Sequence, residues 1–352
     1  MDGELEIDLL IIGQGLAGSA VAMRAIERGY KILVMDEPAQ NHSSVVAAGL
    51  FNPITGRKNV KTWLADEIFP SLHKFYSYAE RVTGTEFFHP MPIYRPFISV
   101  EEQNEWMGNS ADDRYKDYLA GVSFSSGYND RVNDPFGGIT LKQSGYLDTR
   151  RYLEAVREYL TERAAFQSRT FVSDTLEISD EFVRYENIKA ARVIFCQGVR
   201  NDANPWFRTF RVNSLKGEFL TMQCDWGADV ILNRGVYVVP GTLTEGWRVG
   251  ATYNWNDHLP EITPWARKEL TTRLDDLVRM PYTITGQQWG VRPTTPDRKP
   301  IIGAHPEYRS LIIFNGFGTK GVSLAPYFSE VLIRWMEKKG TINKEADVTR
   351  FN

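Results

Sequence analysis

The stretch of sequence that decides the fold is IDLLIIGQGLAGSAVAMRAIERGYKILVMDE, residues 7–37. Residues 7–12 form a nearly continuous apolar run, which is typical of a strand buried in a parallel sheet. An apolar stripe at helical spacing then runs to about Arg28, and residues 31–35 predict a second strand that ends at Asp36. The order of these segments predicts a βαβ unit.

The turn between the first strand and the helix has the pattern Gly-x-Gly-x-x-Gly at residues 13–18. Gly13 permits a tight turn, Gly15 lets the backbone approach a pyrophosphate, and Gly18 allows the helix to pack closely on the strand. The helix N-terminus offers unpaired N–H groups and a partial positive charge to an anion. We therefore predict a dinucleotide site, with Asp36 accepting hydrogen bonds from the ribose hydroxyls. These residues alone fit NAD as well as FAD.

The composition limits the class of protein. The chain has 352 residues, of which 42% are hydrophobic and 24% charged, as in an ordinary globular protein of about two domains. The net charge of −3 is spread without a basic block, which does not favour a polynucleotide surface. Cys196 and Cys224 show no metal-ligand spacing, and no segment resembles a signal peptide or a membrane span. We expect a soluble cytoplasmic protein with no metal, no nucleic-acid partner and no membrane insertion.

Elements of two kinds follow the βαβ unit. Buried strands are predicted at residues 192–196 and 311–314, and short runs at 219–223, 236–239 and 247–251 favour antiparallel pairing. Further helices are predicted over residues 72–84, 149–160, 270–277 and 324–335. The polar segment 101–135 has weak periodicity and many turn formers. This order indicates a discontinuous cofactor domain that is interrupted by a substrate domain.

Short motifs recur along the chain in a defined order. They are the βαβ start, Ala47-Ala48-Gly49 and residues 193–198, 237–241, 249–252, 290–293 and 315–321. In this order and spacing they resemble the D-amino-acid oxidase superfamily of flavoproteins, to which glycine oxidase and sarcosine oxidase belong. The resemblance runs from residue 7 to about residue 335, and it favours FAD over NAD as the cofactor.

The resemblance implies the domain organisation. It implies an α/β fold with a Rossmann-like FAD-binding domain of the glutathione-reductase type and an inserted substrate domain made of an antiparallel β-sheet plus helix. The expected FAD-binding domain comprises residues 1–85, 145–210 and 285–352. The expected substrate domain comprises residues 86–144 and 211–284.

The resemblance also implies where FAD would be held. Residues 43–50 would run along the pyrophosphate towards the flavin ring, a strand around Phe171-Val172 would contact adenine, and residues 196–198 would pass under the ribose. The implied cofactor residues are Gly13, Gly15, Leu16, Ala17, Gly18, Asp36, Glu37, Ser44, Ala47, Ala48, Gly49, Leu50, Val172, Cys196, Gly198, Arg292, Gly316, Phe317, Gly318, Thr319, Lys320 and Gly321. Val46 stands where some members have a histidine that attaches FAD, and no cysteine lies near Gly318. We therefore expect a non-covalent flavin.

Three residues are expected to take part in the chemistry. Arg292 matches the arginine that binds the substrate carboxylate in amino-acid-oxidising relatives, and Tyr237 begins a strand like the one that supplies a tyrosine hydroxyl to the same group. Lys320 would place a positive charge beside N1 and O2 of the reduced flavin. The expected reaction removes hydride from a carbon bearing an amine and delivers it to flavin N5. The simpler roles are a salt bridge for Arg292, core packing for Tyr237 and a solvated lysine for Lys320.

Two other functions stay open. The elements 318–321 and Ala325-Pro326 resemble the flavin domain of a tRNA wobble-uridine-modifying enzyme, although the acidic balance and the missing methyltransferase domain count against it. The chain could also be a non-catalytic dinucleotide-binding module. The basic segment Asn52–Lys61 could contact phosphates, recruit an acidic substrate or face solvent. The substrate, its enantiomer, the electron acceptor and the oligomeric state are not determined by the sequence.

Overall fold

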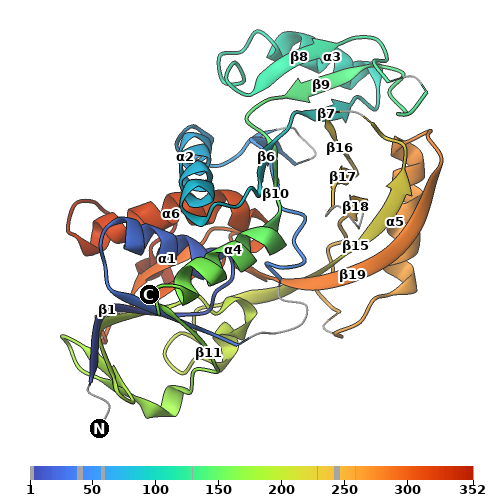
Figure 1. Ribbon diagram of the computed structural model, residues 1–352. Helices are drawn as coiled ribbons and strands as arrows, with labels where there is room; N and C mark the ends of the chain where they lie inside the picture. The colour runs from blue at the N-terminus through green and yellow to red at the C-terminus, as the bar shows by residue number, and fades with distance from the viewer. Residues whose placement is uncertain are drawn as a thin grey trace.

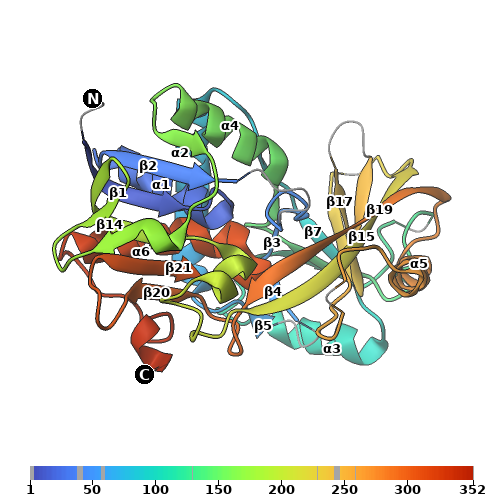
Figure 2. The same ribbon diagram turned by 90° about the horizontal axis from the view of Figure 1, so that it is seen from below.

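The chain forms two large sheets of eight strands each (Figures 1 and 2). The computed structural model describes residues 4–37, 43–56, 60–128, 130–227, 229–241, 246–257 and 259–351. The first sheet contains, in spatial order, β11 (Phe166–Ser168), β2 (Ile32–Asp36), β1 (Leu5–Ile12), β14 (Ile188–Phe195), β13 (Val183–Tyr185) and β12 (Leu176–Ile178), with β21 (Leu311–Asn315) beside β14 and β20 (Ile301–Ala304) beside β21.

The βαβ unit predicted from the first residues is confirmed. β1 pairs in parallel with both β2 and β14, and α1 (Leu16–Glu27) connects β1 to β2. Residues 9–12 are almost fully buried, since β1 lies inside the sheet and has neighbours on both faces. Helices cover the face of this sheet that carries α1 (Figure 1). They are α1, α2 (Ala65–Thr83), α4 (Thr149–Thr161) and α6 (Gly321–Met336).

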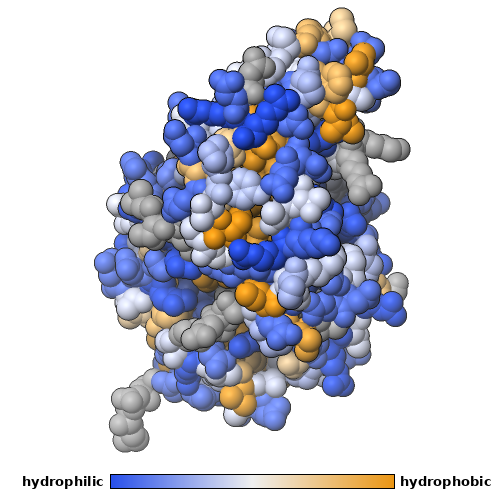
Figure 3. Space-filling view, turned by 90° about the vertical axis from the view of Figure 1, so that its right-hand side faces the viewer, coloured by the Kyte–Doolittle hydropathy of each residue, from blue (hydrophilic) through white to orange (hydrophobic). Residues whose placement is uncertain are grey.

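The second sheet is mainly antiparallel. It contains, in spatial order, β19 (Tyr282–Thr294), β15 (Asn213–Cys224), β18 (Trp247–Gly250), β17 (Val236–Pro240), β16 (Ile231–Arg234), β7 (Ile93–Pro96), β9 (Gly138–Leu141) and β8 (Leu119–Ser123). The antiparallel pairing predicted for the three runs between residues 219 and 251 is confirmed, because β18 pairs with both β15 and β17. α5 (Pro264–Leu277) packs on β15, β17 and β18. The outer surface beside this sheet carries hydrophobic side chains scattered among hydrophilic ones (Figure 3).

Smaller elements complete the chain. They are the strands β3 (Leu50–Phe51), β10 (Gly145–Leu147), β6 (Phe88–Pro90), β4 (Ile54–Thr55) and β5 (Val60–Lys61), the helix α3 (Val100–Asn109), and 3₁₀ turns at Ser173–Thr175, Gly198–Ala203, Gly318–Lys320 and Val348–Phe351. α3 and β8 occupy much of the segment 101–135, for which the sequence showed weak periodicity and many turn formers and predicted no helix or strand. α3 begins at Ser99, whose side chain accepts from the N–H of Glu102, and it buries Trp106. One buried anchor leaves a mostly polar helix, which explains its weak periodicity.

The strand predicted around Phe171-Val172 was wrong. β11 ends at Ser168 after three residues paired with β2, and the chain then leaves the sheet. The N–H of Val172 donates to Tyr185 Oη at 3.1 Å instead of to a neighbouring strand. The ring of Phe171 stacks on that of Tyr185 with centroids 4.8 Å apart, so the apolar pair serves packing outside a strand.

We propose that each large sheet is the centre of one domain. The expected boundary at residue 285 lies inside β19, which pairs with β15 from Tyr282 to Thr294. A boundary after Thr294 leaves this ladder whole, and it assigns β20, β21 and α6 to the domain of the first sheet. β19 then carries residues 290–293 to the junction between the two domains.

Candidate active site

Four strand ends of the first sheet meet at one edge. Ile12 lies beside Met35 of β2 and Phe195 of β14, and Phe195 lies beside Ile313 of β21. All these pairings are parallel, so the segments that follow the strands leave the sheet on the same side. The glycine-rich turn, the residues after β14 and the loop before α6 therefore come together, where ligands of parallel sheets bind.

Two glycines of the glycine-rich turn, Gly13 and Gly18, have no room for a side chain. Gly13 has a φ of +100°, and a Cβ on it would lie 2.6 Å from a carbonyl oxygen of the segment after β14. A Cβ on Gly18 would overlap the carbonyl oxygen of Gly13. Gly15 begins α1 without a capping side chain, and the N–H of Leu16 donates to Ser44 Oγ at 3.1 Å. A cradle of backbone N–H groups at a helix N-terminus fits a diphosphate.

A cavity of about 790 Å³ opens from this turn to the second sheet. Most residues predicted from the sequence line it: Gly15, Leu16, Ala17, Ser44, Ala47, Ala48, Gly49, Leu50, Cys196, Gly198, Tyr237, Arg292, Phe317, Gly318, Thr319, Lys320 and Gly321. Its volume lies within the range of about 300–1,000 Å³ that is typical of ligand pockets. The structure thus brings together segments that are up to 306 residues apart, from Gly15 to Gly321.

Six predicted cofactor residues do not line the cavity: Gly13, Gly18, Asp36, Glu37, Val172 and Gly316. The three glycines lie beneath the residues that line the cavity, where a Cβ would come within 3 Å of atoms from other parts of the chain. Asp36 ends β2 with its carboxylate 3.7 Å from Arg157 Nη2. Glu37 forms an ion pair with Arg200 at 3.0 Å, and this guanidinium holds the pKa of Glu37 below its usual value. Val172 is 49% exposed, so a role at the adenine stays a prediction.

Arg292 lies on β19 opposite Leu215 of β15. Its guanidinium lies against Gly217, where a Cβ would overlap the guanidinium nitrogens. Arg292 Nη1 donates to the carbonyl oxygen of Thr252 at 3.3 Å, and the guanidinium carbon lies 4.9 Å from the ring centre of Tyr253. Gly217 was missed from the sequence. A glycine inside a strand run marks a close approach, and that was the available signal.

Tyr237 lies on β17 opposite Gly250 of β18, and a Cβ on this glycine would overlap the phenol oxygen. Burial raises the pKa of Tyr237 to about 12, an effect that the charges of Arg292 and Arg248 oppose. The phenol therefore stays protonated at neutral pH and can donate one hydrogen bond to a ligand. Tyr237 and Arg292 thus line the cavity together, close enough for the charge of the guanidinium to affect the phenol.

Lys320 precedes α6, on the side of the cavity formed by the first domain. Burial lowers the pKa of its amine, and the nearby charge of Arg298 lowers it further. The amine and the N-terminus of α6 together present positive potential to the ligand. This arrangement suits the negative charge expected on a reduced flavin, which is the role predicted for Lys320.

The side chains that carry a charge at neutral pH in the described lining of the cavity are all cationic. In the described part of the chain it carries Arg95, Arg292, Arg298 and Lys320, and no aspartate or glutamate. Arg95 was missed, because it belongs to a segment without any recognised motif. Other polar lining residues that the sequence did not identify are Asn233, Thr294 and Ser323. A cavity with this charge favours anionic ligands.

The basic segment Asn52–Lys61 divides between the cavity and other surroundings. Thr55 and Gly56 line the cavity, whereas Lys61 forms an ion pair with Asp66 at 2.6 Å. Arg57 and Lys58 lie outside the described residues. In the described part of this segment, the groups that line the cavity are therefore uncharged.

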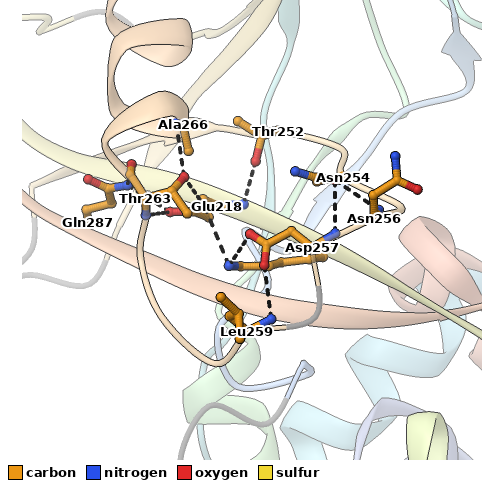
Figure 4. Close-up of polar contacts among 10 residues, drawn as sticks. Glu218, Thr252, Asn254, Asn256, Asp257, Leu259, Thr263, Ala266 and Gln287 are labelled. Carbon is orange, nitrogen blue, oxygen red and sulfur yellow. Dashed lines mark hydrogen bonds and ion pairs between the residues drawn. The ribbon is translucent and has the colours of Figure 1, made fainter.

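A buried polar cluster lies next to the loop that carries Tyr253 (Figure 4). Lys216 Nζ lies 2.6 Å from Asp257 Oδ2 and 4.0 Å from Glu218 Oε1, and Lys216 is only 1% exposed. The carboxylate of Glu218 also accepts from the N–H and hydroxyl of Thr263 and from Gln287 Nε2. These bonds tie the loop after β18 to strand β15, so they hold Tyr253 at its place beside Arg292.

Replacing Asp257 by asparagine is expected to destabilise the protein by about 3 kcal/mol, because a buried lysine loses its charged partner. Urea denaturation of the FAD-loaded protein measures this. The same substitution at the exposed Asp180 is the control, with an expected change within about 0.5 kcal/mol. Equal effects at the two positions would contradict a buried ion pair.

Among the described residues, no group of three or more His, Cys, Asp or Glu side chains could hold a metal ion. No helix in the same ranges combines the length and the apolar character that crossing a bilayer requires. Burial raises the pKa of the Cys196 thiol far above its usual value, so this cavity residue is a poor nucleophile. Non-covalent cofactor binding stays our prediction.

Comparison with known proteins decides the family. The family model described as DAO, FAD dependent oxidoreductase, matches residues 8–335. The chain belongs to this family. It is therefore an FAD-dependent oxidoreductase, and the resemblance stated from the sequence is confirmed. The place of FAD at the glycine-rich turn and the cavity stays a prediction, whereas the family favours an enzyme over a non-catalytic module.

Solved structures share the fold of this FAD-dependent oxidoreductase. Glycine oxidase from Geobacillus kaustophilus superposes with a TM-score of 0.79 at 16% identity, covering 99% of this chain and 98% of the other. L-proline dehydrogenase from P. horikoshii gives a TM-score of 0.76 at 15% identity, with 99% and 98% covered. The predicted α/β fold class is confirmed by this likeness.

Two kinds of curated relatives match over most of the chain. The tRNA 5-methylaminomethyl-2-thiouridine biosynthesis bifunctional protein MnmC of Marinobacter nauticus is 23% identical over 92% of this chain and 54% of its own length. The bifunctional protein ThiO/ThiG of Synechocystis sp. is 24% identical over 91% of this chain and 51% of its own length. The chain thus spans about half the length of these curated relatives.

Proposed function

We propose that this FAD-dependent oxidoreductase oxidises the C–N bond of a small amino acid or of a secondary amine that carries a carboxylate. The observation that carries the proposal is the position of Arg292 in the cavity, against Gly217 and beside the phenol of Tyr237. A guanidinium binds a carboxylate through two parallel hydrogen bonds. Names of structural neighbours, such as glycine oxidase and L-proline dehydrogenase, support the same class of substrate.

Bound FAD supplies the hydride acceptor, and the side chains of the cavity supply orientation. Arg292 would bind the substrate carboxylate, and the neutral hydroxyl of Tyr237 would donate a further hydrogen bond to it. The cavity has no carboxylate among its described lining residues that could neutralise an ammonium group. Its four cations repel a protonated amine, so the substrate would bind with its nitrogen neutral.

An anaerobic screen of the purified holoenzyme tests the proposed function. Amines with and without a carboxylate are compared in matched pairs, such as glycine with methylamine and sarcosine with dimethylamine, and loss of the flavin absorbance is followed. We expect bleaching only by members that carry the carboxylate. Equal bleaching by both members of each pair, or bleaching by none of them, would refute the proposal.

The pH dependence of flavin reduction follows from the state of two groups. At limiting substrate the rate should rise about tenfold per pH unit until the pKa of the substrate amine is passed. Ionisation of Tyr237 should not lower the rate below about pH 11, because burial raises its pKa to about 12 and the phenol donates a hydrogen bond only in its neutral form. Rapid-mixing kinetics from pH 6 to 10 measure this. A decline of the rate near pH 10 would show that Tyr237 ionises earlier.

Replacing Tyr237 by phenylalanine is expected to lower the second-order rate constant about tenfold, because one hydrogen bond to a charged group is lost. The slope of its pH profile should stay unchanged. The phenol at Tyr253 is 58% exposed, so the same substitution there is a matched control. An equal loss at both positions would deny Tyr237 a specific contact.

A nucleic-acid substrate is a second candidate. It is favoured by the name of the MnmC relatives and by two aromatic side chains at the cavity, Tyr253 and Trp255, which are 58% and 42% exposed. Exposed aromatic rings can stack on bases. The net charge of −3 weighs against it. Bleaching of the flavin by a tRNA preparation, together with no response to free amines, would favour this candidate.

A further inference from the structure

Arg95 is a buried cation at the wall of the cavity. It lies on β7 with only 9% of its surface exposed, and it lines the cavity. Its Nη2 donates to the carbonyl oxygen of Gly56 at 3.0 Å, and its Nε has no hydrogen-bond partner. Within the described ranges, no carboxylate lies at ion-pair distance from Arg95. Such a group is destabilising for the fold unless a ligand compensates it.

The charges around Arg95 add to the cost of burying its positive charge. Burial lowers the pKa of Arg95 to about 10, and the positive charge of Arg234 contributes in the same direction. Glu102 is the acid that opposes them, but its carboxylate is engaged by Arg234 at 2.8 Å. The local arrangement therefore leaves a net positive charge at the wall of the cavity.

The position of Arg95 in the sheet separates it from Arg292. β7 pairs in parallel with β16, with Tyr94 beside Leu232, so Arg95 and Asn233 are the next residue after that pair in each strand, and Asn233 lies opposite Tyr237 on β17. Neighbouring strands are about 4.8 Å apart, so the backbones of Arg95 and Tyr237 are about 10 Å apart. Arg292 reaches the cavity from β19, three strands beyond β17 in the opposite direction. The two arginines thus face the substrate end of the cavity from different sides.

We propose that Arg95 forms a second anion subsite, which selects amine substrates that carry another acidic group besides the carboxylate bound by Arg292. The acidic group is a carboxylate or a phosphate ester, since a guanidinium binds both through paired hydrogen bonds. This inference rests on the proposed function, because it names a subclass of the proposed substrates. Asn233 and Thr55 supply neutral polar groups to the same wall of the cavity.

Flavin reduction by matched substrate pairs tests the subsite. Racemic glutamate is compared with glutamine, aspartate with asparagine, and O-phosphoserine with serine, in the wild-type holoenzyme and in Arg95→Gln. We expect the variant to lose the preference for the acidic member by about 10- to 100-fold, from one charge-assisted contact. The neutral member should change by less than about threefold. The carboxylate and phosphate pairs show separately which acidic group the subsite prefers.

Arg273→Gln is the matched control. Arg273 lies on α5, pairs with Glu269 and donates to the carbonyl oxygen of Gly235, so it carries the same charge near the same cavity without lining it. An equal loss of preference in both variants would mean a long-range effect of net charge and would overturn the subsite. An unchanged preference in Arg95→Gln would also overturn it, and so would loss of bound FAD from that variant.

Stability distinguishes a ligand-binding role of Arg95 from a structural one. Removal of an unpaired buried charge should leave the melting temperature of the holoenzyme unchanged or raise it, whereas a structural arginine would lower it. Arg95→Lys keeps the charge and serves as a second variant, which should retain part of the preference. A lower melting temperature in both variants would oppose the proposal.

Binding of unreactive acids separates this inference from the proposed function. Glutarate and butyrate are titrated into the holoenzyme, and the change in the flavin absorption spectrum is recorded. If no amine reduces the flavin but glutarate binds at least about tenfold more tightly than butyrate and only with Arg95 present, the function fails and the subsite stands. If amines reduce the flavin and glutarate has no such advantage, the function stands and the subsite fails.

Discussion

Replacing Arg292 by methionine is expected to lower the second-order rate constant for flavin reduction by about 100- to 1,000-fold, which corresponds to about 3–4 kcal/mol. The reason is the loss of a bidentate contact with the substrate carboxylate inside a partly desolvated cavity. Rapid-mixing kinetics with the best substrate from the amine screen measure the change. FAD content and melting temperature should stay close to those of the wild type, because the Arg292 side chain donates a single hydrogen bond within the described part of the chain, to the carbonyl oxygen of Thr252.

Gly217→Ala gives an independent test of the same contact. A Cβ at this position would overlap the Arg292 guanidinium, so alanine should displace the guanidinium without removing its charge. We expect a loss of about 10- to 100-fold, since misplacement of a binding group is nearly as harmful as its removal. Gly286 lies on β19, where a Cβ would meet only the side chain of Thr221, and Gly286→Ala is the control. Full activity in Gly217→Ala would show that Arg292 does not need its present position.

Replacing Gly18 by alanine is expected to abolish FAD binding and to destabilise the chain by more than about 3 kcal/mol. A Cβ at Gly18 would overlap the carbonyl oxygen of Gly13, which is backbone and cannot rotate away. Relief of that overlap must move α1 away from β1, and the N-terminus of α1 is the expected diphosphate site. The absorbance of bound flavin per protein and the urea midpoint measure the two effects.

Replacing Gly108 by alanine is expected to change the stability of the protein in the opposite direction. Gly108 lies in the last turn of α3, and a Cβ there would meet no atom within 4 Å. Alanine should therefore stabilise the protein by up to about 1 kcal/mol and leave FAD binding unchanged. A yellow, stable Gly18→Ala protein would contradict the assignment of the turn as the diphosphate site.

The parts of the site that the sequence predicted depend on local constraints. Gly13, Gly15 and Gly18 are required at fixed spacing by one turn, and the apolar run before them is required by burial on both faces of a sheet. The loop before α6 was found for the same reason, since its glycines precede a helix that follows a buried strand. Such requirements involve neighbours in the chain, so a single sequence displays them.

The parts that the sequence missed depend on distant partners. Most of β19 pairs with β15, and neither strand has to be apolar where it borders the cavity, so β19 gave no alternating pattern over its thirteen residues. A glycine is required at position 217 because the side chain of Arg292, on the neighbouring strand, packs directly against it. The mistaken strand at Phe171-Val172 arose because aromatic stacking on Tyr185 needs the same apolar residues as a strand.

The sequence by itself determined the βαβ start, the family and the cofactor, because each is encoded by short segments whose physical demands are local. Tertiary structure alone decided the charge of the cavity. Arg95 and Arg292 are 197 positions apart, and they face one cavity only through the order of six strands in the second sheet. The absence of acids from the described lining is likewise a property of the assembled surface. Pairing between distant strands selects which side chains meet, and no local pattern records that choice.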